Sequence, residues 1–234
     1  MTFRDQLMNL PTITVVVPTL NQSEFIGRCL DSVINQNYPR VECLVVDGGS
    51  RDKTKQILTE YGSNISWTSE SDDGQAHAIN KGISQTEGEI VCYLNSDDAL
   101  PLGALHHIGL YFLKNPRVDM VYGRAQIIDE DDSYRGDYPT ADWDWRKFQA
   151  ACIVCQPASF FRRSKWRQLG GFNENLHGAM DYEFWTRLYL EGAIIHYEPI
   201  MLGYTRYHPN TKTQRIRPRI YHEIIGMQIA LIGQ

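Results

Sequence analysis

Residues 12–100 alternate between short apolar segments of strand type and segments whose apolar side chains recur at helical spacing. Repeated strand–helix units predict an α/β fold in which a mostly parallel sheet carries helices on both faces. The predicted strands span 12–19, 41–49, 65–70 and 89–95, and the predicted helices span 23–36, 52–62 and 74–84.

The second half of the chain is less regular. Its predicted elements are, in order, a helix at 102–114, strands at 118–129 and 156–163, helices at 164–172 and 181–192, a strand at 193–208 and a helix at 218–232. No low-complexity linker or internal repeat divides the sequence, so a single domain over residues 1–234 is expected. It would comprise a regular half at 12–100, an irregular half at 101–214 and a terminal helix at 215–234.

Composition and charge argue against several classes of protein. The net charge of −5 gives no support for a nucleic-acid partner. No apolar run approaches the roughly 20 residues that a membrane-spanning helix needs, and the N-terminus lacks the apolar centre of a signal peptide. A cytoplasmic protein is therefore expected. The five cysteines include the pair Cys152 and Cys155, but no second pair or finger-spaced histidines accompany it, so reduced thiols are expected rather than a zinc site.

Polar residues follow each predicted strand of the first half, at Thr19–Asn21, Asp47–Ser50, Glu70–Asp73 and Asn95–Asp98. The carboxyl ends of parallel strands meet at one edge of a sheet, where α/β proteins bind ligands. We therefore expect the four clusters to outline one site. The Gly48–Gly49 pair suits either a plain turn or the close approach of a ligand, and its spacing matches neither a Walker loop nor a dinucleotide fingerprint.

The apolar run 90–94 ends in Asn95 and Ser96, and the adjacent acids Asp97 and Asp98 follow. Adjacent carboxylates at the end of a buried strand repel each other and resist desolvation unless a positive group joins them. Mg2+ or Mn2+ suits such a pair, because these ions bind one or two carboxylates and complete their coordination with substrate phosphates. The alternative is that one acid caps the helix that begins near Pro101. The tripeptide Ser-Asp-Asp also occurs at 71–73 after a shorter strand, so Asp72 is assigned a substrate contact instead.

Two residues of the second half are further candidates. Asp181 stands at the mouth of a predicted helix, where capping is the favoured role. A general base that takes the proton of a hydroxyl is the alternative. His208 follows the last predicted strand. A structural role is favoured for a lone histidine, and completion of a metal site is the alternative.

Six motifs together resemble the family-2 glycosyltransferases of the GT-A fold, over residues 12–210. They are VVVPTLNQSEFIGRCLDSVINQNYP, ECLVVDGGSRDKT, SESDDGQAHAINKGI, GEIVCYLNSDDALPLGAL, GGFNENL with MDYEFWTRL, and YTRYHPN. The resemblance implies a GT-A-type, Rossmann-like sheet followed by an irregular acceptor-side half. It also implies an inverting, metal-dependent transfer from a nucleoside diphosphate sugar, with a UDP-sugar favoured. Residues 12–100 would bind the nucleotide, and 101–214 the metal and the acceptor.

The resemblance further implies roles for individual residues. Asp98 and His208 would hold Mg2+ or Mn2+, and Asp181 would be the catalytic base. The residues that would contact the nucleotide sugar are Pro18, Thr19, Asn21, Asp47, Asp72, Lys81 and Asp97. The motif at 96–98 is Ser-Asp-Asp and lacks the first acid of the family's DXD element, so the division of roles between Asp97 and Asp98 stays open.

Two other functions stay open. A sugar nucleotidyltransferase is disfavoured because no glycine-rich basic loop follows the first strand, and an inactive nucleotide-binding module is disfavoured by the intact acids. The expected acceptor is a glycan or a lipid-linked molecule. The apolar terminal helix is expected to pack on the domain or on the second subunit of a homodimer. The alternative is that this helix and the basic run RIRPR rest peripherally on the inner face of a membrane.

Overall fold

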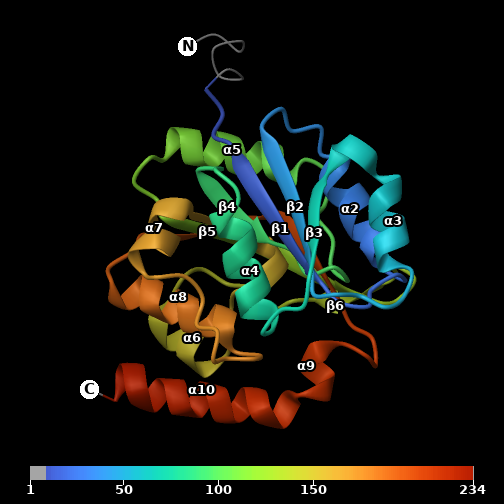
Figure 1. Cartoon of the computed structure of the whole chain (residues 1–234). Helices are drawn as coiled ribbons and strands as arrows, with labels where there is room; N and C mark the ends of the chain where they lie inside the picture. Colours follow the sequence, from blue (N-terminus) through green and yellow to red (C-terminus); the bar gives the residue numbers. More distant parts are fainter. Residues whose placement is uncertain (1–8, 234) are drawn as a thin grey trace.

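The strands of the first half form the parallel part of one sheet (Figure 1). The structure is a computed structural model that describes residues 9–233. Strand β1 (Ile13–Thr19) lies between β2 (Val41–Asp47) and β4 (Ile90–Tyr93), and β3 (Ser66–Ser69) pairs with the outer side of β2. All three pairings are parallel. Strands β1 and β4 are buried over their whole length, as expected where helices cover both faces.

The second half makes the sheet mixed. Strand β7 (Ser159–Arg162) runs antiparallel between β4 and β5 (Met120–Ile128). Strand β5 forms an antiparallel hairpin with β6 (Tyr134–Asp137), and β8 (Ile195–Arg206) pairs with β5 in parallel. The long strand β8 brings its C-terminal end to the loop that follows β4, where Ala99 and Tyr204 form an isolated bridge.

Helices cover both faces, because successive side chains of a strand point in opposite directions. In β1, Val15 and Val17 belong to one core cluster with α2 (Ile26–Ile34), α3 (Thr54–Glu60) and α5 (Ala104–Lys114). Val16 belongs to a second cluster. This second cluster includes side chains of α4 (Gln75–Ser84), α6 (Trp145–Ala150), α7 (Arg163–Gln168) and α8 (Met180–Leu190). Short 3-10 helices occupy Gly62–Asn64 and Gln156–Ala158.

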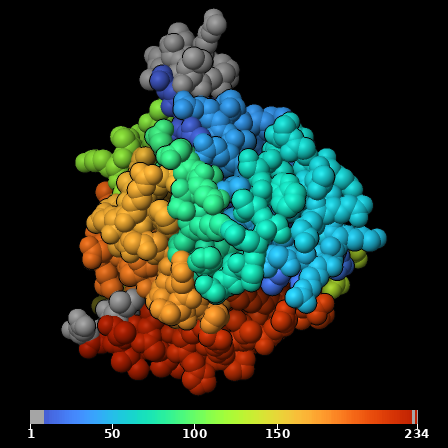
Figure 2. Space-filling model, in the orientation of Figure 1, coloured from blue at the N-terminus to red at the C-terminus, as the bar shows by residue number. Residues whose placement is uncertain are grey.

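The chain then passes through the short helix α9 (Lys212–Arg215) into α10 (Arg217–Ile232), which runs beneath α8 and α6 in Figure 1. In the space-filling view this segment forms a continuous red band along the lower edge of the molecule (Figure 2). Ile224 and Met227 pack against the second cluster, while Tyr221, Ile225 and Ile229 are exposed at intervals of four residues. The helix thus packs on the domain. Membrane or dimer contact through its exposed row stays a prediction, and no helix within residues 9–233 is long and apolar enough to cross a bilayer.

All five cysteines are free thiols, in agreement with the sequence analysis. Cys155 is buried and Cys152 is partly buried. Burial raises the pKa of Cys152 to about 12, so this thiol is protonated at neutral pH. Within residues 9–233 neither cysteine belongs to a cluster of three or more side chains that could hold a metal ion.

Candidate active site

A cavity of about 480 Å³ lies at the carboxyl ends of β1 and β4. Its wall comes from five segments of the chain, which lie within 18–22, 72–78, 93–98, 177–181 and 205–220. The first three follow or flank parallel strands, as the strand-end pattern predicts. The last two come from the irregular half, from the start of α8 and from the connection between β8 and α10. The cavity therefore lies between the regular sheet and the C-terminal segment.

Asp98 is held at the cavity wall by two neutral donors. Its Oδ1 accepts a hydrogen bond of 2.8 Å from the main-chain N–H of Arg206, and its Oδ2 accepts one of 3.1 Å from Nδ2 of Asn95. Helix α5 begins only at Ala104, after Gly103 with φ of 86°, and has no side-chain cap. The alternative that one of the two acids caps this helix is therefore wrong. Burial, followed by repulsion from Asp97, raises the pKa of Asp98 to about 8.

Among the residues described, no cationic side chain donates a hydrogen bond to the Asp98 carboxylate, because the nearby positive groups contact Asp97 and Asp132 instead. The Arg206 guanidinium donates to the main-chain oxygen of Asp97 at 2.7 Å and also bonds to Asp132. His208 is buried, and its Nε2 lies 3.2 Å from Oδ2 of Asp97. Its ring is tilted by 35° against that of Phe25, with 4.7 Å between the centroids. The histidine therefore lies on the Asp97 side of the pair.

This arrangement fits a divalent cation that is shared with a ligand. Asp97 and Asp98 present carboxylate oxygens at the cavity wall, which are the ligands that Mg2+ and Mn2+ prefer. Within the described residues no cluster of three or more His, Cys, Asp or Glu side chains forms a cage of protein ligands. Phosphate oxygens of a substrate would have to complete the coordination sphere, as is common for Mg2+.

Asp181 lines the same cavity from the first turn of α8. Ala179 is the residue before this helix and provides no side-chain cap, while Asp181 lies inside the first turn and accepts from the N–H of its neighbour Tyr182 at 2.7 Å. Its favoured role as a helix cap is therefore wrong. Burial raises the pKa of Asp181 to about 6, so near neutral pH the group is a carboxylate whose proton affinity is higher than usual.

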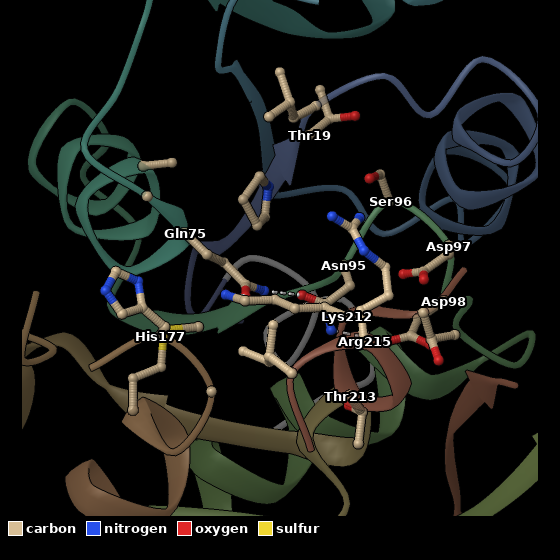
Figure 3. A pocket seen from close by; sticks show the side chains of 18 of the residues that line it. Thr19, Gln75, Asn95, Ser96, Asp97, Asp98, His177, Lys212, Thr213 and Arg215 are labelled. Atoms are coloured by element: carbon tan, nitrogen blue, oxygen red, sulfur yellow. Dashed lines mark hydrogen bonds between the residues drawn. The ribbon is translucent and has the colours of Figure 1, made fainter. Parts of the chain in front are cut away.

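Cationic side chains reach the cavity from the C-terminal segment. Lys212 and Arg215 lie on α9, and Arg219 lies on α10. Lys212 Nζ donates to Oε1 of Gln75 at 2.6 Å, and Gln75 Nε2 donates to Oδ1 of Asn95 at 2.5 Å. Figure 3 shows Lys212 and Arg215 between His177 on one side and the two acids on the other. The sequence analysis did not assign these cations, although the basic character of 212–219 is visible in the sequence.

Two hydroxyl groups of the cavity wall are buried without a partner. They belong to Thr19, which is 5% exposed, and Thr211, which is 7% exposed. A buried hydroxyl without a hydrogen bond costs free energy, so both groups are available to a polar ligand. Thr19 lies at the end of β1 and Thr211 just before α9.

The structure brings six of the predicted site residues to the cavity wall: Pro18, Thr19, Asp72, Asp97, Asp98 and Asp181. Four others, Asn21, Asp47, Lys81 and His208, do not line it.

Asp47 and Asn21 stabilise, through hydrogen bonds, the loops that follow β1 and β2. Asp47 is fully buried and accepts hydrogen bonds from Ser50 and from Oγ of Ser69. Asn21 has φ of 53° and accepts from the N–H of Arg51 at 2.8 Å. Lys81 on α4 instead pairs with Glu70.

The two glycines after β2 form a tight turn, one of the two roles that the sequence suggested, and the close approach at Gly48 is that of a protein side chain. A Cβ at Gly48 would lie 2.7 Å from Oδ2 of Asp72, and Gly49 has φ of 86°. Gly48 thus lets the Asp72 carboxylate approach the end of β2 closely. Asp72 accepts from the N–H of Gly74 at 2.9 Å and faces the cavity.

Comparison with known proteins gives a consistent set of relatives. Residues 14–180 match the family described as Glycosyl transferase family 2. The chain is 25% identical over 236 residues to the chondroitin synthase of Escherichia coli, which covers 97% of this chain and 34% of that protein. The chain spans 34% to 38% of the length of this protein and of two further curated relatives that it matches.

Two solved structures are similar in fold. TarS of S. aureus, residues 1–349 in complex with UDP-GlcNAc, has a TM-score of 0.70 and 18% identity, covering 94% of this chain and 73% of that one. The mannosyltransferase PcManGT of Pyrobaculum calidifontis, in complex with GDP-Man and Mn2+, has a TM-score of 0.73 and 22% identity, covering 97% and 66%. The likeness shows a fold of the GT-A type and confirms the predicted fold class.

Proposed function

The chain belongs to glycosyl transferase family 2, and on this premise we propose that it transfers a sugar from a nucleoside diphosphate sugar to an acceptor hydroxyl, with inversion at the anomeric carbon. One observation carries the proposal. A single cavity gathers the acid pair after β4, an acid at the start of α8 and three cationic side chains from the C-terminal segment. These are the groups that a proton transfer and a departing diphosphate require.

The donor would lie along the ends of β1 and β4. Thr19, Asp72 and Asp97 line this part of the cavity and are proposed as direct contacts, together with Pro18. Asn21 and Asp47 would act through the turns that they fasten. Lys81 would have to leave Glu70 to reach the donor. We favour a UDP-sugar, and TarS, which was solved with UDP-GlcNAc, supports this choice of nucleotide.

Asp98 is proposed to hold Mg2+ or Mn2+, and His208 to belong to the same site through its bond to Asp97. The cation would neutralise negative charge on the departing diphosphate. PcManGT, which was solved with Mn2+ and GDP-Man, supports this assignment. Asp97 and Asp98 differ in burial, and the deeper Asp98 has no cationic side chain hydrogen-bonded to its carboxylate. For this reason we place the metal on Asp98 and leave Asp97 to the donor.

The reaction itself would be a single displacement. Asp181 takes the proton from the acceptor hydroxyl, and the acceptor oxygen forms a bond to the anomeric carbon. The bond from that carbon to the diphosphate oxygen breaks, and the nucleoside diphosphate leaves with the bonding electron pair. Lys212, Arg215 and Arg219 stabilise the charge that develops on the leaving group. Attack opposite the leaving group inverts the configuration.

We propose a glycan as the acceptor, because the E. coli relative is named a chondroitin synthase. The alternative is a lipid-linked acceptor. To distinguish the two, the enzyme is given its donor with either short oligosaccharides or a lipid-linked saccharide, and sugar transfer to each is measured. Transfer to the lipid-linked saccharide alone would overturn the choice of a free glycan.

A panel of UDP- and GDP-sugars tests the function. The enzyme is incubated with each donor and Mn2+ or Mg2+, and release of the nucleoside diphosphate is measured. We expect one donor to be hydrolysed and both D98N and D181N to lose this activity. Pyrophosphate from a nucleoside triphosphate and a sugar phosphate would instead identify a nucleotidyltransferase. Binding of UDP without turnover of any donor would identify an inactive module.

A further inference from the structure

Glu223 of α10 makes an unusual contact with the loop that leads into α8. Its Oε1 accepts from the N–H of His177 at 3.0 Å, and its Oε2 accepts from the N–H groups of Gly178 at 2.8 Å and Ala179 at 3.1 Å. Helix α8 has no cap from its own side chains. A carboxylate from another helix therefore satisfies the backbone donors that precede Asp181.

The same carboxylate also reaches a second wall of the cavity. Oε1 of Glu223 accepts from Nε of Arg219, one turn earlier on α10, at 3.1 Å. The side chain of Glu223 is only 10% exposed, while that of Arg219 is 54% exposed. Both Arg219 and the pair His177–Gly178 line the cavity. Glu223 thus ties the cationic wall to the wall that carries Asp181.

The loop and α10 are also in close steric contact. A Cβ at Gly178 would lie 2.3 Å from Cγ1 of Ile220 and 3.2 Å from Cδ1 of Ile216. Only a residue without a side chain allows the main chain to approach α10 this closely. The position of the loop relative to α10 is therefore fixed by both packing and hydrogen bonds over 177–179.

From these contacts we propose that Glu223 is a positioning residue for sugar transfer: it holds the loop before α8 so that Asp181 meets the acceptor hydroxyl. The inference rests on the proposed function, because it assigns the effect to the reaction of Asp181. Asp181 follows the tethered loop by two residues. General-base catalysis depends on placement of the base, and a misplacement of about 1 Å costs rate even when the ligand still binds.

The test compares E223A and E223Q with the exposed neighbour H222A, using the donor that the wild-type enzyme hydrolyses fastest in the panel. Rates are divided by the number of sites that bind UDP in the same preparation, so that unfolded protein does not contribute. We expect kcat of E223A to fall by about 10- to 100-fold with an unchanged donor KM. E223Q keeps the shape and one acceptor oxygen, and its kcat should be intermediate. H222A should match the wild type.

Hydrogen exchange gives a second readout on the isosteric E223Q. We expect the amides of 177–179 to exchange faster in E223Q than in the wild type, while those of the α8 interior stay unchanged. Full kcat in both E223A and E223Q, with or without a lower unfolding midpoint, would overturn the inference and leave only a structural role. A wild-type enzyme that turns over no donor would overturn the proposed function instead.

Discussion

The main-chain N–H of Arg206 donates a hydrogen bond of 2.8 Å to Oδ1 of Asp98, across 108 positions of sequence. The bond connects the end of β8 with the loop after β4. A backbone donor orients the carboxylate without supplying a full positive charge. Burial, followed by repulsion from Asp97, raises the pKa of Asp98, although this hydrogen bond acts in the opposite direction. The fold therefore places an acid at the cavity wall whose charge is left for a ligand to compensate.

The rate of transfer should depend on pH through Asp181. Burial raises the pKa of this acid to about 6, and a general base must be ionised to act. We expect kcat at saturating donor and Mn2+ to rise with pH until about pH 6 and then to level off. D181N should lose about 100- to 10,000-fold in kcat and should lose this acidic limb. A D181N enzyme that kept the wild-type profile would show that another group is the base.

D181N should also make the protein more stable at pH 7.5. Folding raises the pKa of Asp181 above the unfolded value of about 3.9, so the folded state binds more protons between these two pKa values. Stability therefore increases as the pH falls through about 6 and decreases as it rises. The neutral amide should add about 1–3 kcal/mol to the free energy of unfolding at pH 7.5, and the gain should vanish below pH 4. Urea unfolding at both pH values measures this, and a loss of stability would contradict it.

Lys212 and Arg215 should contribute to binding of the diphosphate. We expect K212A and R215A each to weaken UDP affinity by about 10-fold, because charge-assisted hydrogen bonds to phosphate are strong. The matched control is R217A, since Arg217 belongs to the same basic run but does not line the cavity. Calorimetric titration with UDP measures all three variants. Equal effects from R217A and R215A would point to a diffuse surface charge instead of a built contact.

G178A should destabilise the protein and G226A should not. A methyl group at 178 meets Ile220, whereas one at 226, within α10, meets nothing within 4 Å. We expect G178A to lose about 1–3 kcal/mol of unfolding free energy through overpacking. G226A should gain about 0.5–1 kcal/mol through higher helix propensity. Chemical unfolding of both variants measures the difference, and the same shift in both would remove the support for a tight loop contact.

Local sequence patterns were enough to predict the regular half. The alternation of Val15, Val16 and Val17 between two core clusters follows from an apolar strand that is covered on both faces. The polar residues after β1, β3 and β4 were correctly expected to meet at one cavity. Asp47 was expected there as well, but Ser50 and Ser69 hold its carboxylate inside the turn, and these contacts have no local signature.

The features that the sequence did not predict depend on contacts between distant segments. Lys212 and Arg215 reach the cavity because β8 returns the chain to the loop after β4, where Tyr204 forms a bridge with Ala99. Glu223 bonds to N–H groups 44 to 46 positions away. Helix α6 has only six residues, and its one fully buried apolar side chain is Phe148, so its period is too short to detect. Its cap, Asp144, accepts from the N–H of Lys147 and was the available signal.

Crystals of the protein grown with UDP and Mn2+ test the position of the metal most directly. The anomalous signal of manganese is expected between the Asp98 carboxylate and the diphosphate, with Lys212 and Arg215 on the opposite side of the phosphates. D98N crystals treated in the same way should lack the manganese peak. Manganese and UDP bound together away from Asp98, or a manganese peak that persists in D98N, would contradict the assignment of this cavity.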